Sequence, residues 1–87
     1  MNYINHLFAA ELAKIPPIVR TELEMYQDIA ERIDVLMREQ HLTQRDLARL
    51  TGKRESEVSK WLTGRHNFTM KTIALISTAL GQPIVRV

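Results

Sequence analysis

The sequence predicts an all-α domain of about five helices, with a helical extension at the N-terminus and a short extended segment at the C-terminus. Apolar side chains recur every three or four residues over most of the 87 residues, which is the period of an amphipathic helix. Helix start and stop residues divide this pattern: Thr43 and Thr69 precede periodic stretches, whereas Gly52, Gly64 and Gly81 follow them. A chain of this length supports one helical core.

Two proline residues divide the N-terminal part of the chain. Residues 2–14 can form a short amphipathic helix, whose apolar side would carry Ile4, Leu7, Phe8 and Leu12. Pro16 and Pro17 interrupt it, and Pro17 suits the first turn of a second helix over residues 17–40. A break in this second helix is possible near residues 24–27. Its apolar positions are occupied by Ile18, Leu23, Met25, Tyr26, Ile29, Ile33, Leu36 and Met37.

Residues 42–64 predict two short helices joined by a glycine turn. Thr43 is a suitable N-cap, and Asp46 completes a capping box three residues later. We expect a helix over residues 44–50, with Leu47 and Leu50 pointing inward and the small Ala48 where a second helix crosses closely. Gly52 can end this helix in the left-handed conformation.

The second of these helices is expected from about residue 55 to residue 63. Its apolar face is formed by Val58, Trp61 and Leu62, and Gly64 follows it. Two short helices with a glycine turn predict a helix-turn-helix, which presents its second helix to the major groove of DNA.

A last helix is expected from the N-cap Thr69 to Leu80, followed by Gly81 and Pro83. Its inward residues are Ile73, Ile76 and Leu80. The alternating residues 83–87 weakly favour an extended strand. Trp61, Phe68 and Met70 are expected in the core rather than in a binding site.

Composition excludes several other classes of protein. The chain has no cysteine, which excludes disulfides and thiolate zinc sites and fits a cytoplasmic location. No apolar run is long enough to span a membrane, and the N-terminus lacks the basic region of a signal peptide. His6, His41 and His66 lie too far apart in sequence to suggest a metal site. No phosphate loop, nucleophile elbow or carboxylate pair is present, so we expect no catalysis and no cofactor.

Charge is distributed unevenly along the chain. Residues 1–40 carry four basic and seven acidic side chains, a net charge of −3, whereas residues 41–87 carry eight basic and three acidic ones, a net charge of +5. The basic half contains the predicted helix-turn-helix. This division fits a nucleic-acid-binding region beside a separate protein-contact region, although an ordinary solvated surface would also explain it.

The same region resembles the Cro-like, or XRE-family, helix-turn-helix of phage repressors. Its pattern Gln-x3-Ala-x3-Gly-x5-Val-x2-aromatic is matched by Gln44, Ala48, Gly52, Val58, Ser59, Trp61 and Gly64. The resemblance spans residues 29–80 and departs from the pattern at Lys53 and Arg54, where many relatives carry an apolar residue followed by Ser or Thr. It implies a phage-repressor-like domain that binds double-stranded DNA.

Two groups of residues are candidates for DNA contact. Base contacts are expected from the exposed side of the second motif helix, at Arg54, Glu55, Ser56, Ser59 and Lys60. Phosphate contacts are expected at Gln44, Arg65, His66, Asn67 and Lys71. The alternative for the first group is a solvated helix face, and for His66 and Asn67 it is local turn capping. Glu57 is expected to have a structural role.

The resemblance also implies partners. Relatives usually bind palindromic operators as homodimers, and residues 84–87 or the final helix, with Leu75 and Leu80, could form that contact. The chain further resembles HigA-type antitoxins, which neutralise a RelE-like toxin and repress their own operon. Residues 1–28 are then the candidate arm for a partner or dimer contact, and residues 29–87 the DNA-binding domain. A stand-alone phage-type or mobile-element regulator and a helical adaptor that does not bind DNA remain alternatives.

Overall fold

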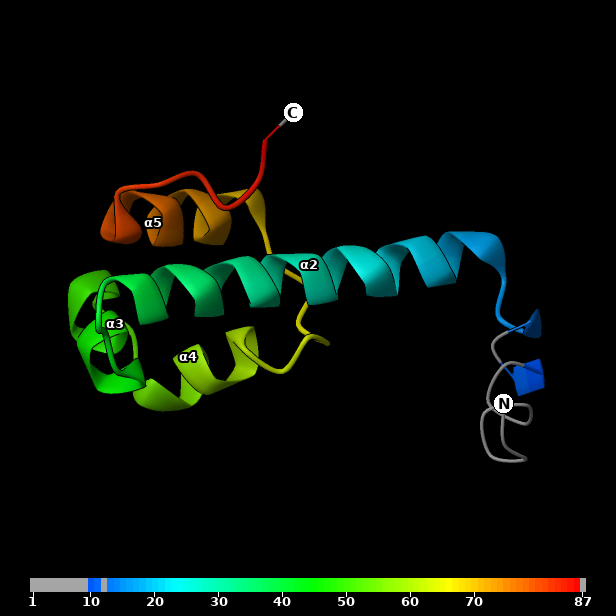
Figure 1. The fold of residues 1–87 in the computed structure, drawn as a ribbon, viewed down its shortest axis with the longest axis horizontal. Coiled ribbons are helices and arrows are strands. Elements are labelled where there is room, and N and C mark those ends of the chain that lie inside the picture. Colours follow the sequence, from blue (N-terminus) through cyan, green and yellow to red (C-terminus); the bar gives the residue numbers. More distant parts are fainter. Residues whose placement is uncertain (1–9, 12, 87) are drawn as a thin grey trace.

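The fold is entirely helical over the residues that the computed structural model describes, which are 10, 11 and 13–86. Its helices are α2 (Pro17–Glu39), α3 (Gln44–Thr51), α4 (Glu55–Trp61) and α5 (Met70–Leu80) (Figure 1). The predicted all-α class is confirmed, although the described part holds four such helices rather than about five. The apolar residues expected along the helix at 2–14, Ile4, Leu7, Phe8 and Leu12, lie outside the described residues.

Helix α2 forms the centre of the domain. It begins after Pro16 with Pro17 in its first turn, as predicted, and continues for 23 residues. The break considered possible near residues 24–27 does not occur, because that stretch contains neither proline nor glycine and every residue in it tolerates helical geometry. The helix gives way to a turn in which His41 has a positive φ of 56°.

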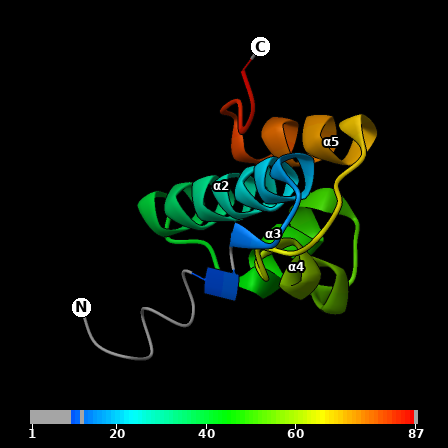
Figure 2. The same ribbon diagram turned by 90° about the vertical axis from the view of Figure 1, so that its right-hand side faces the viewer.

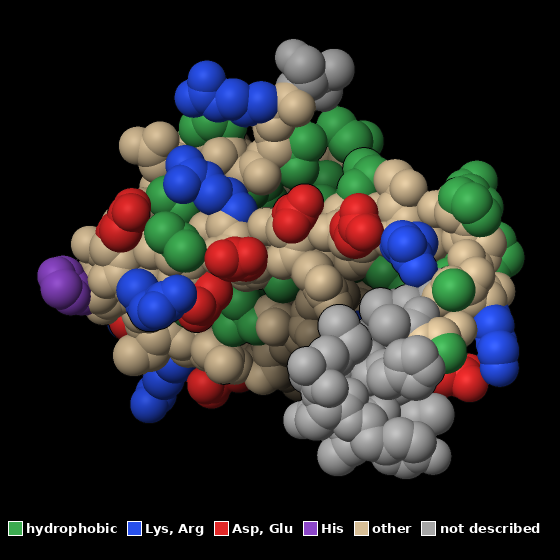
Figure 3. Space-filling view, turned by 45° about the vertical axis from the view of Figure 1, so that its right-hand side comes forward, with side chains coloured by type: hydrophobic (Ala, Val, Ile, Leu, Met, Phe, Trp, Pro, Cys, Tyr) green, Lys and Arg blue, Asp and Glu red, His purple; other side chains and the backbone are tan. Residues whose placement is uncertain are grey.

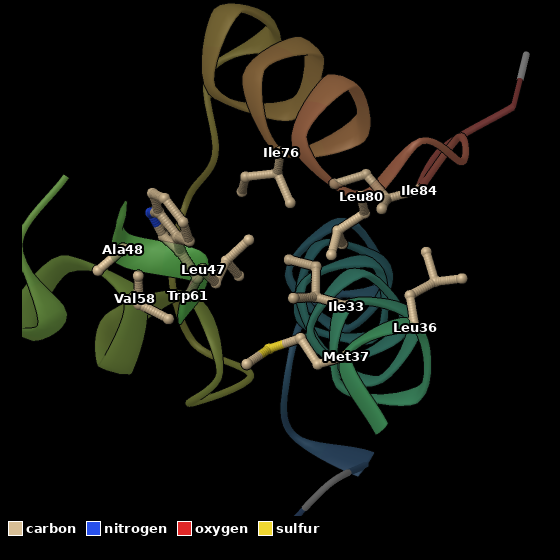
Figure 4. Close-up of a cluster of buried hydrophobic side chains, with 10 residues drawn as sticks. All are labelled: Ile33, Leu36, Met37, Leu47, Ala48, Val58, Trp61, Ile76, Leu80 and Ile84. Carbon is tan, nitrogen blue, oxygen red and sulfur yellow. The ribbon is translucent and has the colours of Figure 1, made fainter. Parts of the chain in front are cut away.

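The other helices surround the C-terminal half of α2. Figures 1 and 2 show α5 on one side of α2, α4 on the other, and α3 near the C-terminal end of α2. Buried side chains from all four helices and the C-terminal segment meet between them (Figure 4). This core consists of Ile33, Leu36, Met37, Leu47, Ala48, Val58, Trp61, Ile76, Leu80 and Ile84.

The N-terminus of α3 has the predicted capping box. The backbone N–H of Asp46 donates to Thr43 Oγ1 over 3.1 Å, and the backbone N–H of Thr43 donates to Asp46 Oδ2 over 2.9 Å. At the other end, Gly52 adopts the expected left-handed conformation with φ 70°. Both ends of α3 are therefore determined by local sequence.

The capping box predicts a pH-dependent effect of the substitution Asp46→Asn. The hydrogen bond from the Thr43 backbone lowers the pKa of the Asp46 carboxyl, helped by the Thr43 side chain and the Arg49 charge. Because this pKa is lower in the folded state, the stabilisation is complete above the ordinary carboxyl pKa of about 4 and is lost as the pH falls through the folded-state value. We expect Asp46→Asn to lower the urea midpoint at pH 7, and the difference from wild type to shrink towards pH 2. A difference that is unchanged by pH would contradict this.

Some expected core residues are exposed instead. Leu50 is 54% exposed because Leu47, Ala48 and Thr51 form the buried face of α3, and Leu50 lies about 60° beyond Leu47 on its far edge. Met70 is 70% exposed at the start of α5. The predictions that Leu50 and Met70 are core residues are therefore wrong.

The apolar positions of α2 are buried only in its C-terminal half. Ile18, Leu23 and Met25 are exposed, whereas Ile33, Leu36 and Met37 are buried. The reason is geometric, because α2 extends well beyond α4 and α5 at its N-terminal end (Figure 1). Periodicity identified the apolar side of the helix but not the point at which its neighbours stop covering it.

The C-terminal end packs onto the core. Thr69 Oγ1 accepts from the Thr72 N–H at 3.1 Å, which confirms the predicted N-cap of α5. Gln40 Nε2 donates to the Leu80 carbonyl over 2.7 Å, and the Ile84 N–H donates to Ser77 Oγ over 3.3 Å. Residues 83–86 form no strand. Since Leu80 and Ile84 are buried within their own chain, they are not available for the dimer contact expected of them.

Candidate nucleic-acid interface

Helix α4 has one buried side and one exposed side. Val58 and Trp61 are 0% and 1% exposed and hold the helix against the core. Each predicted base-contact residue of the helix itself is exposed, namely Glu55, Ser56, Ser59 and Lys60. At about 100° per residue these four cover the arc opposite Val58 and Trp61. The helix therefore presents a continuous polar surface to a ligand.

The ends of α4 differ slightly from the prediction. Arg54 is the N-cap, with an extended backbone (φ −79°, ψ 153°), and its side chain forms no capping hydrogen bond. Arg54 is exposed and lies just before the helix rather than on it. The helix ends at Trp61 with Leu62 as C-cap, so the expected extension to Thr63 is wrong. Residues 62 and 63 form a turn instead.

Helices α3 and α4 are joined at their exposed edge. Ser59 Oγ donates to Gln44 Oε1 over 2.7 Å. The buried Ala48 lies at the α3–α4 packing in the core, as the small side chain predicted. Since Gln44 uses its oxygen in this bond, its amide N–H groups are available to a phosphate. The structure thus brings together one predicted phosphate contact and one predicted base contact.

The connection from α4 to α5 follows a defined path. Thr63 Oγ1 donates to the Lys60 carbonyl over 2.8 Å and accepts from the Arg65 N–H at 3.1 Å. Gly64 has φ 79°, a backbone conformation that favours glycine, and a Cβ there would lie 3.3 Å from Gln27 Cγ, a tight contact. This turn positions the exposed Arg65 directly after α4.

The remaining predicted phosphate contacts have different environments. His66 is half-buried and packs edge-on against Phe68, with ring centroids 4.8 Å apart and an interplanar angle of 86°. That packing favours a structural role for His66 over a phosphate contact. Asn67 is exposed in the loop, and Lys71 is exposed in the first turn of α5.

Three further basic side chains belong to this region although they were not among the predicted contacts. Arg45, Arg49 and Lys53 are exposed on α3 and on the turn after it. Arg49 pairs with Asp46 over 2.9 Å at an exposed site. The uneven charge distribution included all three, and the structure places them on the surface of α3 and of the turn that leads to α4. Together with Arg54, Lys60 and Arg65 they make the region attractive to a polyanion.

The acidic residues of α4 are placed where they can stabilise the helix. Glu55 and Glu57 lie in the first turn, where negative charge interacts favourably with the helix dipole. Glu57 is half-buried, in keeping with the expected structural role. Glu55 is exposed and can also accept a hydrogen bond from a base edge.

Other kinds of site were sought in the part of the chain that the structure describes. It contains no cluster of three or more His, Asp or Glu side chains suited to a metal ion. None of its helices combines the length and apolar character needed to cross a membrane.

The sequence profile of the helix-turn-helix family matches residues 34–87, which is more than half of the chain and includes α3, α4 and α5. No curated protein and no solved structure matches the chain significantly. The match, the paired helices and the exposed polar side of α4 agree with one another. The chain therefore belongs to the XRE-type helix-turn-helix family of DNA-binding transcription regulators.

Proposed function

We propose that the protein is a sequence-specific repressor that binds a palindromic operator as a homodimer. The observation that carries this proposal is the exposed polar side of α4, which lies opposite the buried Val58 and Trp61. A helix held in this way can enter the major groove without disturbing the core. Residues 29–87 would then act as the DNA-binding domain.

In this proposal the two groups of residues have different tasks. Arg54 and Lys60 can donate to guanine O6 and N7, Glu55 can accept from cytosine N4, and the serine hydroxyls can serve either. Gln44, Arg65, Asn67 and Lys71 are exposed and would contact the DNA backbone. Phosphate contacts fix the position of the protein on the duplex, and the α4 side chains supply the sequence preference.

The experiment is a fluorescence-anisotropy titration with DNA from upstream of the gene and with random DNA of equal length. Each is measured at two salt concentrations. We expect tight binding to the upstream fragment alone and an affinity that falls with salt, because phosphate contacts release counterions. Equal and weak binding to both fragments would contradict a sequence-specific repressor.

A second function is favoured by the N-terminal half of α2. Val19 and Leu23 remain more than one third exposed, and residues 17–31 carry four acidic side chains against one basic one. This acidic, partly apolar surface suits a basic protein partner, in line with the resemblance to HigA-type antitoxins and with a RelE-like toxin. Residues 1–28 would form the contact arm. The competing explanation is that the arm serves only the protein's own folding or assembly.

Deleting residues 1–14 tests this second function, with far-UV circular dichroism as the fold control. Lost folding would show that the segment is needed for packing. A folded variant that no longer inhibits mRNA cleavage by a toxin encoded beside the gene would support the antitoxin role. A folded variant that inhibits as well as wild type would show that residues 1–14 are not needed for the toxin contact.

A further inference from the structure

The N-terminal half of α2 extends beyond the rest of the domain and leaves apolar side chains at the surface (Figure 1). We name residues 17–28 the α2 overhang. Ile18 is 79% exposed and Met25 is 56% exposed. Figure 3 shows apolar side chains at the surface beside a band of acidic ones. Exposed apolar residues grouped on one helix often mark a contact surface.

A groove of about 710 Å³ runs along this overhang. One wall contains Ile18, Met25 and Ile29 of α2, and the other contains residues of the α4–α5 connection, of α5 and of the C-terminal segment. At about 100° per residue, the three α2 residues lie within about 20° of the buried Leu36 around the helix axis. The groove is therefore the place where the core face of α2 continues without a covering helix.

The length of the groove suits one more helix. From Ile18 to Ile29, α2 rises by about 16 Å, at about 1.5 Å per residue. A helix of about three turns spans the same length and can place apolar side chains in the groove at every third or fourth position. Recognition of an amphipathic helix by an apolar groove uses this geometry.

The charged side chains of the groove are acidic. Glu22 and Asp28 line it, and no Lys or Arg is among its lining residues. Around the axis of α2 these two carboxylates lie on opposite sides of the apolar stripe of Ile18, Met25 and Ile29. Tyr26 Oη donates to Glu22 Oε2 over 2.6 Å, which orients that carboxylate. An occupant with basic side chains beside its apolar ones therefore complements the groove, whereas an acidic helix would be repelled.

Two parts of this chain that could reach the groove are unsuited to fill it. Residues 13–16 leave the N-terminal end of α2 on the side away from α5, whereas the groove lies on the α5 side (Figures 1 and 2). The overhang of a second copy carries three acidic side chains and one basic one, so its charge does not match the groove. These observations favour a helix from a different protein.

We propose that the groove binds a basic amphipathic helix of a partner protein. Its apolar side chains would pack against Ile18, Met25 and Ile29, and its Lys or Arg side chains would lie beside Glu22 and Asp28. The inference deepens the second proposed function and rests on it for the existence of a basic protein partner. It adds the kind of segment that is bound, and it places one wall of the binding site in residues 67–85 rather than in residues 1–28.

The position of the groove also leaves the DNA-binding surface open. The groove lies on the side of α2 that carries α5, whereas α4 lies on the other side (Figures 1 and 2). A helix bound there leaves the polar surface of α4 uncovered. The partner and DNA can therefore be bound at the same time.

The first test is a calorimetric titration of the full chain with a model peptide, without DNA and without a toxin. The peptide is a helix of about four turns built from leucine and lysine, with leucines at every third or fourth position. Its matched counterpart carries glutamate in place of each lysine. We expect the lysine peptide to bind at least ~10-fold more tightly, because it pairs with Glu22 and Asp28. The net charge of the chain, +2, would favour the glutamate peptide, so this order of affinities reports the groove itself.

Charge substitutions locate the bound lysine peptide. We expect Glu22→Gln/Asp28→Asn to weaken its binding by about threefold to tenfold, because two exposed charge pairs are lost. The matched control Glu24→Gln/Glu39→Gln removes two exposed carboxylates of α2 that do not line the groove, and should change the affinity by less than about twofold.

Apolar substitutions provide an independent location. Ile18→Ser/Met25→Ser should weaken the lysine peptide at least ~10-fold, because the peptide loses two apolar contacts. Both side chains are exposed, so the circular dichroism spectrum should be unchanged. The matched control Leu50→Ser changes a 54% exposed side chain on α3 and should bind as wild type does.

The other results each point to a different occupant or to none. A lysine peptide that binds no more tightly than the glutamate peptide, or that is insensitive to the groove substitutions, would overturn the inference. A wild-type dimer that Ile18→Ser/Met25→Ser dissociates in sedimentation would assign the groove to a second copy instead. At least ~10-fold tighter peptide binding by Leu7→Ser/Phe8→Ser would assign it to the chain's own N-terminal segment.

These measurements are separate from the proposed functions, because none of them includes DNA or a toxin. If the lysine peptide binds the groove but the chain does not inhibit a toxin encoded beside its gene, the antitoxin function alone is refuted. If the chain inhibits such a toxin and Ile18→Ser/Met25→Ser inhibits it equally well, the toxin contact lies outside the groove and the inference is overturned.

Discussion

Replacing Arg54 and Lys60 together by alanine is expected to leave the fold intact and to remove most of the operator affinity. Both side chains are exposed, one at the N-cap of α4 and one on its polar side, so neither contributes to the core. A bidentate contact to a base contributes about 1–3 kcal/mol. Where both residues make such contacts, the dissociation constant for the upstream fragment should rise at least ~30-fold.

The measurement is the anisotropy titration, with thermal unfolding as the check on the fold. Its matched control is Lys14→Ala/Arg38→Ala, which removes the same charge from two exposed side chains outside α3 and α4. We expect the control to change the affinity by less than about threefold, because distant surface charges are screened by salt. If Arg54→Ala/Lys60→Ala binds the upstream fragment as tightly as wild type, Arg54 and Lys60 do not make the proposed base contacts.

Much of the fold could be predicted because its signals are local. The Thr43 and Thr69 caps, the left-handed Gly52 and the turn at Gly81 each depend on a few neighbouring residues. The inward positions of Val58, Trp61 and Ile76 followed from helical periodicity. What the sequence could not provide was the extent of each neighbouring helix, which is a tertiary property. For that reason the apolar pattern of the helix could not show that Ile18 is exposed.

In the candidate site, too, the features that depend on local sequence could be predicted and those that depend on tertiary structure could not. The polar side of α4 was predictable, because it is the complement of an apolar pattern. The hydrogen bond between Ser59 and Gln44 was not, because it joins side chains fifteen positions apart in two helices whose relative placement depends on the core. The same applies to His66, whose packing against Phe68 depends on the course of the loop.

Replacing Trp61 by alanine is expected to have the largest effect on stability. Trp61 is 1% exposed and joins α4 to the central core cluster. Removing a buried tryptophan typically costs about 3–5 kcal/mol, and small domains have only about 5–15 kcal/mol in total. A large part of the unfolding free energy should therefore be lost. Because the chain has one tryptophan, the urea transition must be followed by far-UV circular dichroism.

The variant Trp61→Phe separates packing from hydrogen bonding. No described residue accepts a hydrogen bond from Trp61 Nε1, so phenylalanine removes a buried donor without leaving an acceptor unpaired. We expect a smaller loss of roughly 1–2 kcal/mol, owing to the reduced volume. The control Leu50→Ala, at a 54% exposed position, should stay within about 0.5 kcal/mol of wild type. A phenylalanine variant as unstable as the alanine variant would contradict this expectation, because it would mean that the phenyl ring recovers none of the packing made by the indole ring.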